Sequence, residues 1–295
     1  MKKNRLAVIG ANSFLARNFI SQIDKNLSEL VLYDIQDKHL DNEERYSKID
    51  LLDREDVLNK IDFSADLIYI FSGKTGTKSG FEKYEEFISI NETGLLNILW
   101  SYVKSESKSK IIYPSSRLVY KSSSTPVKED DVLEAKSIYA VTKIACENYL
   151  KIYHDVWGVK FNIFRICVPY GTLIKNISSY GTYEFFTNQA KKGEDITLFG
   201  DGSSRRTFTH IKDLCSILAS APSLIDCDCG IYNVGGDTKS LNDIAKAISA
   251  EYSVGIKYIQ WPEIDKNLEV ESVVFDSTKL DRIINYKYQT LNVDK

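Results

Sequence analysis

Short apolar runs alternate with longer helical stretches through the first 168 residues, and this alternation constrains the fold more than any other feature of the chain. Runs rich in residues that favour β-strands occupy 6–9, 30–33, 67–71, 111–113 and 161–166. Segments of helical length occupy 14–24, 53–60, 81–105 and 138–157. Because parallel strands need crossover connections of about this length, the pattern predicts an α/β fold with a doubly wound parallel sheet.

The rhythm loosens after residue 169. Glycine-containing loops alternate with short apolar runs, and a helix is predicted near 240–252 after Ser240, a residue type that commonly caps helices. We predict that residues 1–168, together with about 209–235, form the domain that holds the sheet. The remaining segments, about 169–208 and 236–295, are predicted to form a smaller C-terminal α/β lobe over one end of the sheet.

Composition excludes several classes of protein. A net charge of −3 over 295 residues argues against a nucleic-acid-binding surface, which needs a concentrated basic face. No apolar stretch has the length of a membrane span, and the run 6–9 is too short for the core of a signal peptide. The lone pair Cys227 and Cys229 offers two ligands where structural zinc needs four, so no metal is predicted. Reduced cysteines in a cytoplasmic protein are expected.

The end of the first strand carries a possible dinucleotide site. Gly10 closes the strand just before a helix, where a pyrophosphate can bind exposed backbone amides. A Gly-x-x-Gly-x-x-Gly spacing would place glycines at 13 and 16, where this chain has Ser13 and Ala16. Asp34 ends the second strand 24 residues beyond Gly10, close to the offset of about 20 residues at which an acid accepts the adenosine ribose hydroxyls. A carboxylate there favours NAD over NADP.

Tyr139 and Lys143 lie four residues apart and therefore share one face of a predicted helix. A fixed cation beside a phenol favours the phenolate, which lowers the tyrosine pKa toward the range where it can act as a general base. A chance pair on an exposed helix is the alternative interpretation.

Taken together, these features resemble an extended short-chain dehydrogenase/reductase of the NAD-dependent sugar-nucleotide epimerase/dehydratase family, similar to the UDP-glucose 4-epimerases, from about residue 5 to 290. The resemblance implies a Rossmann-type domain and a substrate-binding lobe. Its landmarks are, in chain order, the Gly10 loop, Asp34, 49–51, 71–74, Asn91 with Gly94, 115–120, 139–143, 165–171, 200–202, 206–213 and 232–235.

The resemblance assigns roles to individual residues. Tyr139 would exchange a proton with a sugar hydroxyl, Lys143 would keep Tyr139 ionised and hold the nicotinamide ribose, and Ser116 would orient the substrate oxygen. Arg206 would bind the diphosphate of a sugar nucleotide, so the predicted substrate-binding residues are Ser116, Tyr139 and Arg206. The predicted cofactor contacts are Gly10, Ser13, Phe14, Leu15, Asp34, Ile35, Asp50, Leu51, Phe71, Ser72, Gly73, Lys74, Asn91, Tyr139, Lys143 and Cys167.

Several residues depart from the family pattern. The 4,6-dehydratases carry an Asp-Glu pair after the catalytic hydroxyl, whereas this chain has Arg117 and Leu118, which cannot serve as general acid or base at neutral pH. Lys266 stands where the epimerases show a second phosphate-binding arginine, and Val168 replaces a common asparagine. These changes argue against 4,6-dehydration and against an ordinary UDP-hexose pose.

We therefore predict an NAD-dependent sugar-nucleotide epimerase, acting at C4 through a transient 4-keto intermediate. The alternatives are an NAD(P)H-dependent reductase of a 4-keto-6-deoxy sugar nucleotide and a non-catalytic dinucleotide-sensing protein. A nucleotide sugar is the predicted partner, with neither nucleic acid nor membrane, and a homodimer is expected to form through helices 81–105 and 138–157. His39 is predicted to be solvated.

Overall fold

The central feature of the protein, described here by a computed structural model covering residues 3–175, 177, 181–270 and 272–291, is a seven-stranded sheet. Its strand order is β10-β6-β5-β4-β1-β2-β3, and every neighbouring pair is parallel. The predicted doubly wound parallel sheet is thus confirmed. The strands are β1 (Asn4–Ile9), β2 (Ser28–Asp34), β3 (Tyr46–Lys48), β4 (Leu67–Ile70), β5 (Lys110–Ser116), β6 (Lys160–Ile166) and β10 (Cys229–Asn233).

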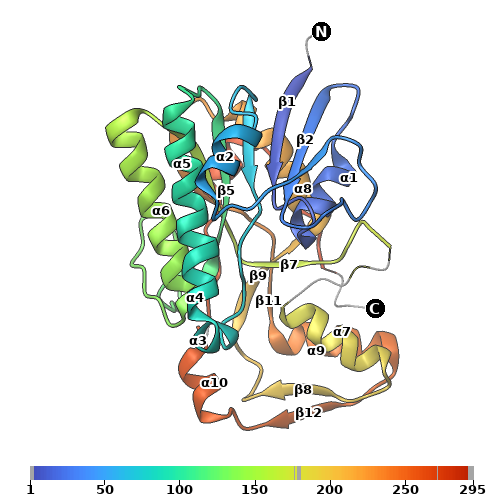
Figure 1. Ribbon diagram of the computed structural model, residues 1–295. Helices are drawn as coiled ribbons and strands as arrows, with labels where there is room; N and C mark the ends of the chain where they lie inside the picture. The colour runs from blue at the N-terminus through green and yellow to red at the C-terminus, as the bar shows by residue number, and fades with distance from the viewer. Residues whose placement is uncertain (1–2, 176, 178–180, 271, 292–295) are drawn as a thin grey trace.

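Helices cover both faces of this sheet (Figure 1). One face is covered by α1 (Phe14–Gln22), α8 (Ile211–Leu224) and α11 (Thr278–Ile284), and the other by α2 (Arg54–Lys60), α5 (Gly94–Lys104) and α6 (Ile138–Trp157). Successive β1 side chains enter opposite cores, since Leu6 and Val8 pack under α1 whereas Ala7 and Ile9 pack under α5. Burial on both faces explains why the strands read as continuous apolar runs.

The remaining elements form a smaller lobe beyond the carboxyl ends of the strands (Figure 1). Two small sheets, β11-β9-β7 and β12-β8, pack with α7 and α9 around a third apolar core. Ser240 caps α9 in a reciprocal capping box with Asp243, as predicted. The elements are β7 (Val168–Tyr170), α7 (Thr182–Lys191), β8 (Ile196–Phe199), β9 (Arg205–His210), β11 (Asp237–Ser240), α9 (Leu241–Tyr252), β12 (Ile256–Ile259) and α10 (Glu263–Leu268). The assignment of cofactor and substrate binding to two separate parts of the chain stays a proposal.

The helix predicted over 81–105 is confirmed from Tyr84 to Lys104, but it contains a π-helical turn and is interrupted at Lys83. The segment is divided into α3 (Ser79–Glu82), α4 (Tyr84–Phe87), a π-helical turn (Ile88–Thr93) and α5. Lys83 leaves helical backbone geometry, with φ −122° and ψ 31°, and separates α3 from α4. Within the π-helical turn the Asn91 carboxamide accepts a hydrogen bond from Lys74 N at 2.7 Å and donates to Lys74 O at 3.1 Å. Single π-turns occur frequently at functional sites, and this one holds the loop that follows β4.

The strand order places a crevice beside β1. β1 is flanked by β2 on one side and β4 on the other, so the connections run in opposite directions from it. Ligands of doubly wound sheets bind at the carboxyl ends of the strands at such a switch point. Within the described ranges, no helix combines the length and apolar character needed to cross a membrane.

Candidate functional site

The loop after β1 requires glycine at its first position. Gly10 N donates to Tyr33 O at 2.8 Å, and the residue has φ +80°. A Cβ at Gly10 would lie 2.3 Å from Ser72 N, so the loops after β1 and β4 approach more closely than any side chain allows. Ser13 Oγ accepts a hydrogen bond from Ala16 N and thereby caps α1, and Ala16 is fully buried. The two missing glycines are therefore replaced by a cap and a packing residue.

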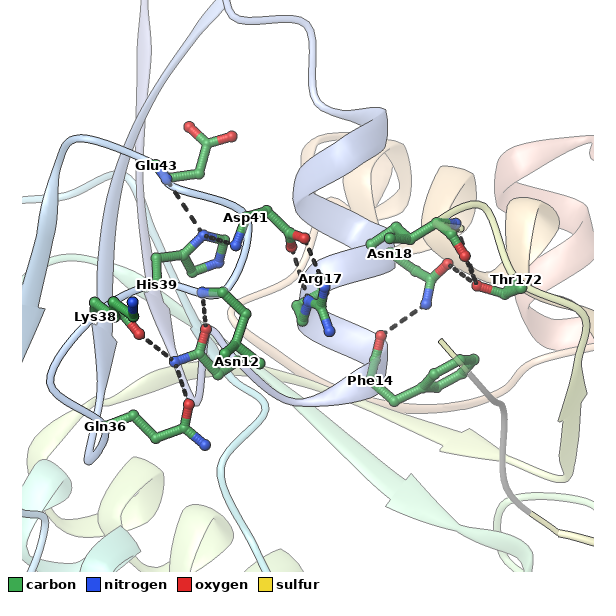
Figure 2. A network of polar contacts seen from close by, with 12 residues as sticks. Asn12, Phe14, Arg17, Asn18, Gln36, Lys38, His39, Asp41, Glu43 and Thr172 are labelled. Atoms are coloured by element: carbon green, nitrogen blue, oxygen red, sulfur yellow. Dashed lines mark hydrogen bonds and ion pairs between the residues drawn. The ribbon is translucent and has the colours of Figure 1, made fainter. Parts of the chain in front are cut away.

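Asn12, which our sequence analysis missed, holds the loop that follows β2 (Figure 2). Its backbone N–H donates to Asp34 Oδ2 at 2.9 Å. Its side chain donates to Gln36 Oε1 and Lys38 O and accepts from Leu40 N, at 2.9–3.1 Å. One residue of the β1 loop thus fixes both the predicted ribose-binding carboxylate and the loop beyond it. No local sequence pattern predicts these hydrogen-bond partners of Asn12, because they lie 22–28 residues away in the sequence.

The same loop pairs a cation with a carboxylate (Figure 2). Arg17 on α1 binds Asp41 through two hydrogen bonds, and this pairing lowers the Asp41 pKa. His39 is 2% exposed, and its Nδ1 accepts hydrogen bonds from Asp41 N and Glu43 N. The prediction of a solvated His39 is wrong, because the loop folds back on its own imidazole. Arg17 has its counter-ion in Asp41, which suits a cofactor without a 2′-phosphate.

A cavity of about 320 Å³ gathers most of the predicted site residues at the carboxyl ends of β1, β4, β5 and β6. It brings together residues that the sequence separates by more than 150 positions. The predicted residues that line it are Ser13, Phe14, Leu15, Phe71, Ser72, Gly73, Lys74, Ser116, Tyr139, Lys143 and Cys167. A helix N-terminus at one wall supplies backbone N–H donors for a pyrophosphate, and the volume lies within the usual range for ligand sites.

Six predicted cofactor residues do not line this cavity. Gly10 lies behind Ser72, Asp34 lies at the Asn12 loop, and Asn91 acts through Lys74. Of the other three, Ile35 follows β2 and is exposed, whereas Asp50 and Leu51 follow β3 and are exposed and half-buried, respectively. Their contact with an adenine stays a prediction.

Lys143 is the buried cation of the cavity. Its Nζ donates to Tyr113 Oη at 3.0 Å and to Pro114 O at 2.8 Å, and lies 6.0 Å from the centre of the Tyr139 ring. Burial lowers the Lys143 pKa to about 8, while nearby Cys146 and Glu147 oppose this shift. The ammonium is therefore charged at neutral pH but close to its titration range.

Ser116 lies at the end of β5 and caps the short 3₁₀ turn Arg117–Val119 through a hydrogen bond from Leu118 N to its Oγ. The preceding Ser115 donates to Glu147 Oε1 at 2.6 Å. Glu147 in turn forms a bidentate pair with Arg165, in which both side chains are 1% exposed. The buried pair fixes the end of β5 against α6, where Tyr139 and Lys143 reside.

Cys167 also lines the cavity, and its thiol is buried. Burial raises the Cys167 pKa, and its Sγ donates to Val273 O at 3.5 Å. The thiolate, and not the neutral thiol, is the nucleophile, so a raised pKa makes Cys167 unreactive. Cys167 therefore contributes shape to the cavity wall.

Arg206 lies in a second cavity of about 420 Å³, within the smaller lobe. Its Nη1 donates to Thr182 Oγ1 at 2.7 Å, and its Nη2 bonds Glu269 Oε1. Aromatic side chains that our sequence analysis missed line this cavity: Phe185, Phe199 and Trp261, of which the last two stack with ring centres 4.9 Å apart. An arginine beside stacked aromatic rings suits a nucleotide, whose base stacks and whose phosphates bind guanidinium groups.

Comparisons with known proteins agree with this geometry. The NAD dependent epimerase/dehydratase family matches residues 6–235. A UDP-glucuronate 4-epimerase of Thermodesulfobacterium geofontis is 25% identical over 232 residues, covering 76% of this chain and 68% of that protein. A dTDP-4-dehydro-6-deoxyglucose reductase of Escherichia coli is 23% identical over 271 residues, covering 84% and 81%.

Solved structures share the fold. The crystal structure of a Thermus thermophilus UDP-glucose 4-epimerase complexed with NAD superimposes with a TM-score of 0.81 at 22% identity, over 94% of this chain and 92% of that one. The Gly10 loop, the α1 N-terminus and the Asp34 carboxylate fit a dinucleotide without a 2′-phosphate. The chain belongs to the NAD-dependent epimerase/dehydratase family, as its sequence motifs predicted.

Proposed function

We propose that the protein is an NAD-dependent sugar-nucleotide epimerase that inverts C4 through a transient 4-keto sugar. The observation that carries the proposal is the single cavity that Ser116, Tyr139 and Lys143 share with the loops after β1 and β4. A sugar placed there would have a proton acceptor and a hydride acceptor within reach of one carbon. The UDP-glucuronate 4-epimerase relative supports the same reaction class.

Each side chain has a task that its surroundings support. Tyr139 removes the proton of the C4 hydroxyl and returns it after inversion. Lys143 stabilises the phenolate by its charge, and Ser116 holds the substrate oxygen with its hydroxyl. NAD, when bound, supplies the hydride acceptor and donor. Arg117 and Leu118 provide no general acid or base, which supports epimerisation over dehydration.

The second cavity supports a nucleotide substrate. Arg206 would bind the diphosphate, and the Phe199–Trp261 stack would flank the base. Most of the described side chains that line this cavity are apolar.

Two measurements test the proposal. Denaturing the purified protein should release NAD, because an epimerase recycles its cofactor. A panel of UDP-, dTDP- and GDP-sugars should reveal C4 inversion that falls by about 10²–10⁴-fold in Tyr139→Phe, the usual range for a lost general base. Inversion that survives this change at the wild-type rate would contradict the proposal.

One observation favours a second candidate. The dTDP-4-dehydro-6-deoxyglucose reductase relative aligns over most of the chain. For a 4-keto sugar-nucleotide reductase the protein should purify without nucleotide and oxidise added NADH or NADPH with a 4-keto substrate. The released nucleotide therefore decides between the two reactions before any sugar is chosen.

A further inference from the structure

Two arginines and one carboxylate meet at the wall of the second cavity. Arg206 Nη2 bonds Glu269 Oε1, and Arg117 Nη2 lies 3.8 Å from the same oxygen. Arg117 also donates from Nη1 to Val270 O at 3.2 Å. The side chains of both arginines are at least nine-tenths buried, at 10% exposure for Arg117 and 4% for Arg206. Two buried cations thus share one carboxylate, which leaves one positive charge without a counter-ion inside the cluster.

Two further observations show that this charge is poorly compensated. Arg206 Nε is buried and has no hydrogen-bond partner among the described residues. Burial, followed by repulsion from Arg117, lowers the Arg206 pKa to about 10. Buried charges are costly unless they are paired and hydrogen-bonded, so the cluster is prepared for an additional anion.

Glu269 is the member of the cluster that can leave. Its side chain is 20% exposed and lines the second cavity beside Arg206. Its backbone is held at the end of α10, where its N–H bonds Asp265 O and its carbonyl accepts from Lys136 Nζ. Rotation of the Glu269 side chain alone would therefore open both guanidinium groups without moving the chain.

The cluster also lies next to the reacting centre. Arg117 directly follows Ser116, which lines the catalytic cavity, and Arg206 and Glu269 line the second cavity. Lys266, predicted at the position of a second phosphate-binding arginine, is exposed on α10. Arg117 is thus the second buried arginine at the junction of the two cavities.

We infer that Arg117 and Arg206 form an oxyanion clamp for the substrate, and that Glu269 is its resident counter-ion, which the substrate oxyanion replaces. This inference rests on the proposed sugar-nucleotide substrate. The oxyanion is either the phosphate that carries the sugar or a carboxylate on the sugar itself. Both offer the planar or forked oxygen pair that guanidinium groups bind.

Binding measurements by titration calorimetry test the clamp. The wild type is first screened against UDP, dTDP and GDP to find the base that binds most tightly. Four ligands with that base are then compared: the nucleoside monophosphate, the diphosphate, the diphosphohexose and the diphosphohexuronate. Removing the competing carboxylate in Glu269→Gln should tighten diphosphate binding about tenfold. Arg117→Gln should weaken it by about 10–100-fold, as expected for a lost charge-assisted hydrogen bond, and should leave the monophosphate unaffected.

The two sources of the oxyanion give different patterns. Weaker binding of the free diphosphate in Arg117→Gln assigns the phosphate, whereas weaker binding of the hexuronate alone assigns the sugar carboxylate. Arg205→Gln and Glu263→Gln serve as matched controls, because Arg205 is an exposed neighbour of Arg206 and Glu263 is exposed on α10. Circular dichroism confirms that each variant folds, and Glu269→Gln tests the clamp independently should Arg117→Gln fail to fold.

Other outcomes overturn the inference. Equal affinities of Arg117→Gln and wild type for all four ligands would show that Arg117 is structural. Monophosphate binding that weakens in Glu269→Gln would show that Glu269 is itself a substrate ligand. A wild type that binds nucleotide but inverts no sugar would overturn the proposed epimerisation and leave the clamp standing. A wild type that binds none of the nucleoside diphosphates overturns both.

Discussion

Lys143 illustrates how burial and function oppose each other in one residue. In the proposed mechanism the ammonium must be charged to stabilise a phenolate, yet burial lowers its pKa to about 8. Glu147, one helical turn further along α6, opposes this loss of charge. The Glu147 carboxylate already accepts hydrogen bonds from Arg165 and Ser115, and the Arg165 charge offsets much of its electrostatic stabilisation of the Lys143 ammonium. The result is a cation that titrates near the upper end of the physiological pH range.

Activity should therefore fall as pH rises through about 8, because Lys143 loses its charge there. The pH dependence of kcat/KM for sugar inversion measures this directly. Lys143→Arg keeps the cation at all accessible pH values and should move the alkaline limb upward, even if the rate is lower. An unchanged alkaline limb in Lys143→Arg would show that another group titrates.

Stability should change in the opposite direction over the same interval. The folded pKa of about 8 lies below the ordinary value of 10.5, so between these values the unfolded chain binds more protons at Lys143 than the folded chain. Stability then rises with pH, since the cost of a buried charge disappears. Urea denaturation of wild type and Lys143→Met between pH 7 and about 10.5 should show wild type gaining stability relative to the variant.

Gly10→Ala should be severely destabilising. The residue has φ +80°, and an added Cβ would lie 2.3 Å from Ser72 N, a backbone atom that cannot withdraw without moving β4. We expect a loss of at least about 2 kcal/mol in the free energy of unfolding. Gly158→Ala is the matched control, because Gly158 has φ +68° and, its chain neighbours and own helix backbone aside, no described atom lies within 4 Å of an added Cβ, so only about 1 kcal/mol of backbone strain is expected. Equal losses in the two variants would contradict the close approach of the two loops.

At the scale of the elements, the buried Glu147–Arg165 pair joins α6 to β6, and Ser115 adds the end of β5. Arg165 also donates to Tyr120 Oη, which bonds Asn233 on β10. The pair therefore fixes the helix of Tyr139 and Lys143 against the strand of Ser116. The π-helical turn also fixes α6, because Asn91 bonds Lys74 in the loop after β4 and donates a hydrogen bond to Thr142 Oγ1 on α6.

Glu147→Gln should cost about 3–5 kcal/mol of stability, because it leaves the Arg165 guanidinium buried without a counter-ion. Urea denaturation measures this loss. The double variant Glu147→Leu with Arg165→Met removes both charges and should recover much of it. A double variant as unstable as Glu147→Gln would indicate that packing, and not charge, sets the cost.

At the scale of the whole molecule, α6 carries four exposed large apolar side chains. They are Val141, Ile152, Val156 and Trp157. Exposed Tyr84 and Ile88 belong to the neighbouring segment that contacts α6. We propose that this apolar face forms a homodimer, in which the segments 81–105 and 138–157 of two copies pack together.

The variant Ile152→Glu should convert this dimer to a monomer, because it places a charge in the middle of the apolar face. Sedimentation equilibrium gives the mass directly. Ile264→Glu is the control, since Ile264 is 65% exposed on α10 in the smaller lobe and should leave the mass unchanged. A wild type that sediments as a monomer would contradict the proposal.

The sequence by itself determined the local elements of this protein. Strand and helix alternation, Gly10 at the end of β1 and the spacing of Tyr139 and Lys143 follow from periods and steric limits that act over a few residues. These features predicted the sheet and the loop after β1, whereas most of the residues that line the 320 Å³ cavity were predicted from the family resemblance. No local pattern predicts the π-helical turn within 81–105, where Asn91 bonds Lys74.

Only the tertiary structure decided the electrostatics of the site. Glu269 pairs with Arg117 and Arg206, which lie 152 and 63 residues away in the sequence. Asn12 accepts a hydrogen bond from Leu40, which lies 28 residues away. The pKa of Lys143 depends on how completely the fold removes water from it. Propensity and spacing act between neighbours in the chain, whereas burial and charge act between neighbours in space, and the latter exist only once the chain has folded.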